Sequence, residues 1–105
     1  MPYYTPYEMR ERMLDAPLRS TELRVSVPII NRHIIALERG RAAPPIKVGD
    51  GTVMGGVHWY VAGYLVGRLP AIDRVPAPPP NVIRYSFRQV IFEAVDWENM
   101  IGRRP

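Results

Sequence analysis

The spacing of apolar and polar residues predicts six short elements between positions 21 and 75. Residues 21–27 alternate polar and apolar side chains, as a half-buried strand does, and residues 29–39 repeat apolar positions at helical spacing. Two strands are expected around the Gly49-Asp50-Gly51 turn signal, then a helix and a last strand. These four elements are expected at 46–48, 52–54, 57–66 and 71–75. This order is typical of a small α+β domain with a short mixed sheet and packed helices.

The two ends of the chain differ from this middle part in composition. Residues 1–20 are interpreted as an N-terminal arm with a short helix over 6–15, whose tyrosines we expect to hold the arm against the domain. The core is expected at 21–76, and residues 77–105 form a proline spacer and a tail. Alternation over 82–87 predicts a strand, and the apolar run after it fits a strand or a helix. We expect the tail to dock on the core, with pairing to a partner chain as the alternative.

Length and composition exclude several classes of protein. A chain of 105 residues fits one small domain, and its lack of cysteine excludes disulfides, thiolate metal sites and a cysteine nucleophile. It has no apolar run of about 18 residues and no basic-then-apolar start, so we expect neither a membrane span nor a signal peptide. A cytoplasmic location is therefore expected.

The chain is basic, with a formal net charge of +4, and its 14 basic residues are all arginine except Lys47. Arginine suits the recognition of phosphate and carboxylate groups, so the charge permits binding to nucleic acid or to an acidic partner. A GC-rich genome, which favours arginine codons, is the alternative explanation of the bias. The candidates for a basic surface are Arg32, Arg39, Arg41, Arg84 and Arg88.

A glycine pair, Gly55-Gly56, opens the apolar stretch that contains His58. Glycines before a helix let backbone N–H groups approach an anion closely, so the candidates for binding a nucleotide or another anion are Gly55, Gly56, His58, Trp59 and Tyr60. His58 fits a phosphate contact or acid–base role, but we favour a ring hydrogen-bonded to local backbone. Trp59 fits stacking on a base, but we favour packing. No metal ligand set has the required spacing.

Three pieces of the chain together resemble the ParB/sulfiredoxin fold family over about half the sequence. They are Pro-Pro-Ile-Lys-Val at 44–48, the hairpin at Asp50-Gly51, and Gly-Gly-Val-His-Trp-Tyr-Val-Ala at 55–62, which is similar to the family's Gly-Gly-x-His-Arg-Tyr-x-Ala box. Val57 stands where sulfiredoxins have their cysteine, and Trp59 stands where the family has an arginine that grips nucleotide phosphates. The resemblance therefore implies the fold without sulfiredoxin chemistry, and with phosphate binding weakened by the loss of the arginine.

Taken together, these features favour a non-catalytic ParB-like binding module whose partner is nucleic acid or protein. No cofactor is expected, and a nucleotide ligand stays open. One alternative is a nucleotide-binding or nuclease-type enzyme that uses His58 with an acidic residue such as Asp50 or Asp73. Another is an immunity, antitoxin or accessory interaction protein, in which the arm and tail hold a homodimer together.

Overall fold

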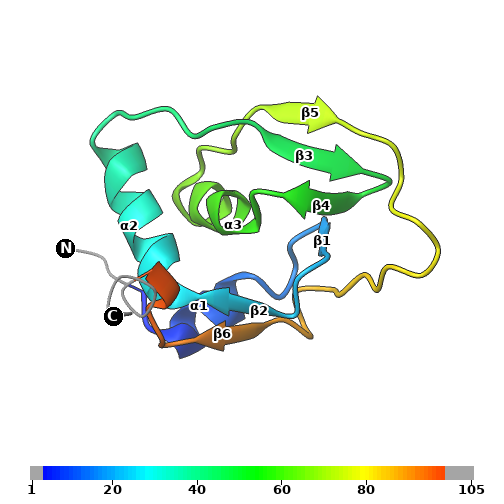
Figure 1. Ribbon diagram of the computed structural model, residues 1–105. Helices are drawn as coiled ribbons and strands as arrows, with labels where there is room; N and C mark the ends of the chain where they lie inside the picture. The colour runs from blue at the N-terminus through cyan, green and yellow to red at the C-terminus, as the bar shows by residue number, and fades with distance from the viewer. Residues whose placement is uncertain (1–3, 99–105) are drawn as a thin grey trace, which may run out of the picture.

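Helix α3 lies at the centre of the molecule, with a four-stranded sheet on one side and helix α2 on the other (Figure 1). The computed structural model describes residues 4–98. The elements of this part are α1 (Pro6–Arg12), β1 (Arg19–Ser20), β2 (Arg24–Ser26), α2 (Val27–Glu38), β3 (Ile46–Gly49), β4 (Thr52–Gly55), α3 (Val57–Val66), β5 (Ile72–Arg74) and β6 (Ile91–Glu93).

The larger sheet has the strand order β1-β4-β3-β5 and is mixed. Strands β3 and β4 are antiparallel, whereas β1 runs parallel to β4 and β5 runs parallel to β3. Asp50 and Gly51 join the hairpin with positive φ angles of 49° and 67°, as a two-residue turn between twisted strands requires. The α+β class, the short mixed sheet and the order of the six elements between 21 and 75 are confirmed.

The junction between β2 and α2 differs from the predicted strand over 21–27 and the predicted helix over 29–39. The Ser26 side chain accepts a hydrogen bond from the Ile29 N–H and caps the helix, which begins at Val27. Pro28 lies in the first turn, where its missing N–H costs no helical hydrogen bond. The strand is correspondingly short, because Ser26 already serves as the cap.

The N-terminal helix follows its sequence signals but ends early. Thr5 and Glu8 form a reciprocal capping box with Pro6 in the first turn, and the helix stops at Arg12 rather than near residue 15. Met9 and Met13 are completely buried in the core. The arm is therefore part of the packed structure through these two side chains.

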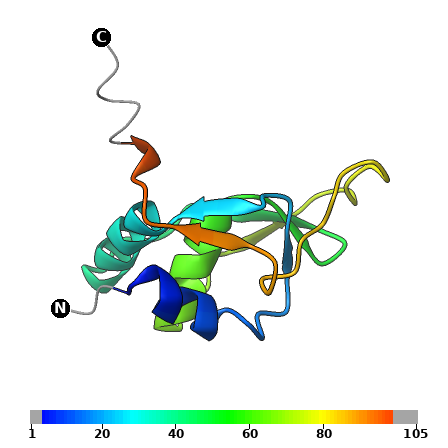
Figure 2. The same ribbon diagram turned by 90° about the horizontal axis from the view of Figure 1, so that it is seen from below.

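The tail packs against β2 and α1, but its first predicted strand is wrong. Over 82–87 the structure has one isolated bridge, between Tyr85 and Ser20, in place of a strand. The alternating residues do not share one environment, because Ile83 is 64% exposed whereas Phe87 is buried. The tail then forms β6, which pairs in parallel with β2, so the strand alternative is the one observed (Figure 2). No helix among residues 4–98 is both long and apolar enough to cross a membrane.

Candidate functional site

The glycine pair lies where β4 meets α3. Gly55 is the last residue of β4, and Gly56 is the N-cap of α3 with a φ of 88°. A β-carbon on Gly56 would lie 2.9 Å from Ile46 Cγ2, whereas one on Gly55 would approach Lys47 Cδ only to 3.7 Å. Both the backbone angle and the lack of space therefore require glycine at 56. Gly56 also leaves α3 without a side-chain cap.

His58 is tied to the backbone at the start of α2. The Ser26 N–H donates to its Nε2 at 3.0 Å, so the neutral ring carries its proton on Nδ1. The ring of Trp97 meets the imidazole edge-on, with centroids 5.2 Å apart and planes at 80°. The pKa of His58 is lowered to about 4, mainly by burial and to a smaller extent by the nearby His33, against a raising effect of Glu98. His58 does bind backbone, but the N–H comes from a residue 32 positions earlier, not from a neighbour.

Trp59 packs between the two long helices. Its ring stacks on that of His33, with centroids 3.7 Å apart and planes 4° from parallel. Burial also lowers the pKa of His33. The faces that these two rings turn toward each other are therefore used in joining α3 to α2, and neither is open to a base.

Tyr60 belongs to the core. It is 2% exposed, its hydroxyl accepts a hydrogen bond from the Leu18 N–H at 3.4 Å, and its ring packs on Phe87 at 5.6 Å. Burial raises its pKa. Successive helix residues point about 100° apart, so His58, Trp59 and Tyr60 face three different surroundings. The structure does not bring the predicted site side chains together around one ligand position.

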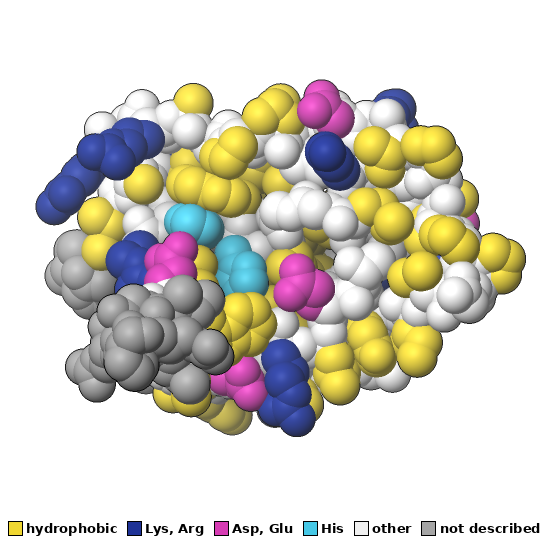
Figure 3. Space-filling view, in the orientation of Figure 1, with side chains coloured by type: hydrophobic (Ala, Val, Ile, Leu, Met, Phe, Trp, Pro, Cys, Tyr) yellow, Lys and Arg dark blue, Asp and Glu magenta, His cyan; other side chains and the backbone are white. Residues whose placement is uncertain are grey.

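A C-terminal segment, residues 93–98, lies beside the two histidines and was not predicted as part of the site. Trp97 Nε1 donates to Glu93 Oε1 at 3.0 Å, and the Ser26 hydroxyl donates to the Val95 carbonyl at 2.8 Å. Arg32 holds Asp96 through two hydrogen bonds of 2.7 and 2.9 Å. Figure 3 shows the histidines next to each other at the surface, bordered by charged and apolar side chains. The only sequence signal for this neighbourhood is the aromatic Trp97 between two acidic residues.

The five candidate arginines are divided between two regions and are mostly paired with acids. Arg84 contacts Asp50 at 2.6 Å, and Arg88 contacts Asp15 at 3.3 Å. Arg32 is held by Asp96 and Glu98 of the tail. Arg39 and Arg41 follow α2 and line a shallow hollow with Arg32, Ile35 and Ala36. The five arginines therefore do not form one continuous cationic surface.

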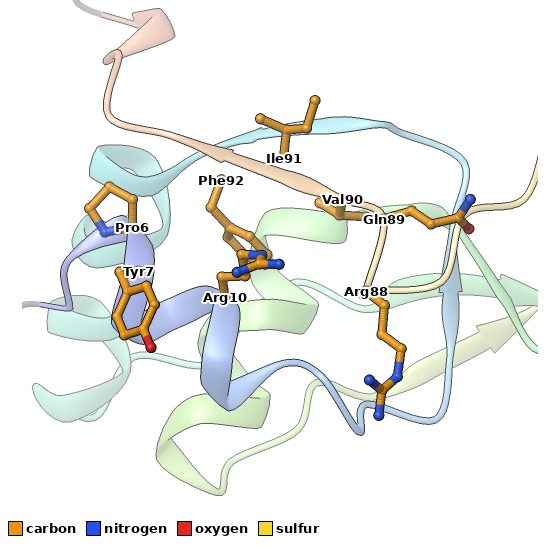
Figure 4. A pocket seen from close by; sticks show the side chains of 8 residues that line it. All are labelled: Pro6, Tyr7, Arg10, Arg88, Gln89, Val90, Ile91 and Phe92. Atoms are coloured by element: carbon orange, nitrogen blue, oxygen red, sulfur yellow. The ribbon is translucent and has the colours of Figure 1, made fainter.

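A hollow of about 360 Å³ lies between α1 and the segment 88–92. Figure 4 shows Gln89 and Arg88 directed away from Tyr7 and Arg10, so the polar groups do not converge on a single point. A small-molecule site needs such convergence. Within residues 4–98 no group of three His, Asp or Glu side chains is placed to hold a metal ion.

No protein-family model matches the chain, and comparisons with curated proteins and with solved structures found no significant match.

Proposed function

We propose that the chain is a ParB/sulfiredoxin-like domain that acts as a non-catalytic binding module for a protein partner. The observation that carries the proposal is the hydrogen bond from the Ser26 N–H to His58 Nε2. It gives the box histidine a structural task in place of a chemical one.

A general base needs a free lone pair and a pKa near the working pH. The lone pair of His58 Nε2 accepts the Ser26 N–H, and burial holds the pKa of the ring at about 4. Asp50, one of the acidic residues considered as its catalytic partner, lies at the tip of the β3–β4 hairpin and contacts Arg84. It is at the opposite end of β4 from α3. These contacts favour a binding module over a hydrolytic enzyme.

The charge distribution favours a protein over a nucleic acid as the partner. A basic side chain promotes nucleic-acid binding by neutralising a phosphate, which releases the counterion of that phosphate. An arginine that already contacts a carboxylate contributes less to this effect, and Arg32, Arg84 and Arg88 are in such pairs. Leu69 and Ile72 border one apolar hollow, and grouped apolar side chains of this kind are typical of interaction surfaces. The described surface exposes six large apolar side chains in all. These are Tyr7, Leu69, Ile72, Ile83, Ile91 and Val95.

Cross-linking in the native cells, followed by affinity purification of the tagged chain, tests this function. We expect a protein at constant stoichiometry that stays bound through a high-salt wash, because apolar contacts are not screened by salt. Duplex DNA or RNA released steeply by salt would contradict a protein partner and favour the nucleic-acid alternative. Turnover of nucleotides or nucleic acid that disappears in His58→Ala would contradict a non-catalytic role. A homodimer in sedimentation, with no other protein bound, would replace the partner by a second copy.

A further inference from the structure

Strand β5 forms an open edge of the larger sheet. Its neighbour on one side is β3, and Figure 1 shows no helix or strand beyond it on the other side. The Ile46 N–H donates to the Ala71 carbonyl and the Val75 N–H donates to the Val48 carbonyl. Because the direction of backbone groups alternates along a strand, the N–H and C=O groups of Ile72 and Arg74 point outward. They are placed to hydrogen-bond an added strand.

An apolar hollow of about 230 Å³ lies on the same face as the Ile72 side chain. Leu69 and Ile72, on its rim, are 61% and 49% exposed. The rest of the lining is Pro17, Leu18, Ile46, Tyr60, Tyr64 and Pro70. Side chains on neighbouring strands lie about 5 Å apart on the same face, so a residue paired with Ile72 would point toward this hollow.

The surroundings of the hollow are basic. A second depression shares Leu69 and Pro70 with it and is also lined by Arg41 and Arg68. Arg68 is fixed by donating to the Leu37 carbonyl at 2.6 Å. Arg74 is exposed on the edge strand itself. Apolar contact beside these cations suits a segment that carries both apolar and acidic side chains.

A second copy of β5 fits this edge poorly. In a two-fold antiparallel pair, outward-pointing residues must face each other. If the two-fold axis passes through Asp73, the two copies of Asp73 lie opposite each other. If it passes through Arg74, the two copies of Arg74 lie opposite each other, and Ile72 faces Pro76, which has no N–H. If it passes through Ile72, Arg74 faces Pro70, which has no N–H either. Every register loses a hydrogen bond or opposes like charges.

We propose that β5 is a docking edge for an extended, acidic segment of the protein partner, which adds a strand beside Ile72–Arg74 and places an apolar side chain in the hollow. This inference rests on the proposed function and names the surface and the partner chemistry.

Selection of displayed random peptides on the full chain provides the probe, and the enriched peptides are then measured by fluorescence anisotropy. We expect an apolar residue with Asp or Glu two positions away, because Ile72 and Arg74 lie on the same face of β5 and Asp73 on the other. Leu69→Glu should weaken binding by about tenfold or more, because it brings a like charge to the rim. Ile83→Glu is the matched control, since Ile83 is similarly exposed at 64% but does not line the hollow, and it should leave the affinity unchanged. Circular dichroism confirms that both variants are folded.

Hydrogen exchange of the peptide complex tests strand addition directly. The Ile72 and Arg74 amides should gain protection, whereas the Asp73 amide, which points toward β3, should change little. Enriched peptides that are basic, or that bind Leu69→Glu and the parent chain equally, would overturn the inference. A cellular partner that still binds Leu69→Glu would overturn this surface while leaving the proposed function standing. If neither a cellular protein nor any peptide binds the parent chain, both the docking edge and the proposed function are contradicted.

Discussion

The rings of Trp59 and His33 stack in parallel, 3.7 Å apart, and this contact joins α3 to α2. The position where the ParB/sulfiredoxin resemblance expects a phosphate-binding arginine is thus part of the contact between two helices. A flat aromatic side chain suits that place, because it covers the imidazole face and adds apolar area between the helices.

Trp59→Ala should lower the free energy of unfolding by about 2 kcal/mol, less than for a fully buried tryptophan because Trp59 is only partly buried. Urea denaturation of the parent, Trp59→Ala, His33→Ala and the double variant measures the stack itself. We expect a coupling of about 1 kcal/mol, the usual value for an aromatic pair. Strictly additive single effects would show that the stack contributes nothing beyond burial.

Placing an arginine at position 59 tests the resemblance to the ParB/sulfiredoxin box. The parent chain should show no thermal shift with nucleotides, whereas Trp59→Arg, compared with its own nucleotide-free midpoint, should gain one through charge-assisted phosphate contacts. Trp59→Gln is the control for loss of the ring without gain of a cation. If Trp59→Arg responds no more than Trp59→Gln, the box does not mark a dormant nucleotide site.

The free energy of unfolding should decrease as the pH is lowered through the range in which His58 titrates. Burial depresses its pKa from 6.5 to about 4, so the unfolded chain takes up the proton first. The stabilising contribution of the neutral ring is complete above pH 6.5 and is lost as the pH falls toward 4. We expect a loss on the order of 2 kcal/mol, discounted for the part of the ring that solvent reaches.

The control for this pH effect is His58→Gln, whose amide oxygen can accept the Ser26 N–H without titrating. The free energy of unfolding of the parent minus that of His58→Gln should decrease as the pH falls below 6.5. Both proteins carry the same carboxylates, so the effect of carboxylate titration cancels in this difference. A difference that stays constant with pH would show that the ring is not held neutral.

Removing Trp97 should raise the pKa of His58. The indole covers the imidazole edge-on, and burial is the main cause of the depressed pKa. In Trp97→Ala, water reaches the ring and its pKa should move toward 6.5, as followed by NMR of the imidazole protons. Val95→Ala keeps the backbone carbonyl that accepts the Ser26 hydroxyl and should leave the pKa unchanged. If the pKa of His58 is unchanged in Trp97→Ala, the imidazole is buried by α2 and β2 and not by Trp97.

The two neighbouring glycines should respond differently to alanine. Gly56→Ala combines a φ of 88° with a contact of 2.9 Å to Ile46 Cγ2, and should cost about 2 kcal/mol or more. Gly55→Ala meets only an ordinary contact with Lys47 and should change stability by about 0.5 kcal/mol or less. Equal costs in thermal denaturation would contradict this account of the glycine pair.

The order of elements between 21 and 75 could be predicted because each element has a local signal. Alternation marks β2, helical spacing and the following Gly40 mark α2, and the Asp50-Gly51 turn fixes the hairpin. The tail shows the limit of such signals. The alternating apolar residues over 82–87 do not lie on one buried face, because Phe87 is buried whereas Ile83 is exposed. The segment forms only an isolated bridge and no strand.

The surroundings of the candidate site could not be predicted in the same way. His58 depends on Ser26 and Trp97, which are 32 and 39 positions away, and neither spacing is periodic. Whether the candidate arginines are paired likewise depends on distant carboxylates, as the contact between Arg32 and Asp96 shows. A sequence shows which groups are present, whereas tertiary structure decides which of them are already paired.

The parallel pairing of β2 with β6 has a consequence for the order of folding. It joins segments nearly seventy positions apart, and the core beneath it combines Met9 and Met13 with Phe87, Val90 and Phe92. Long-range closure is slow, because the entropy of a large loop is lost before its contacts form. We therefore expect the β3–β4 hairpin and its helices to organise first. A chain cut after β5 should stay partly open, and synthesis must pass residue 92 before the hydrophobic interior can close.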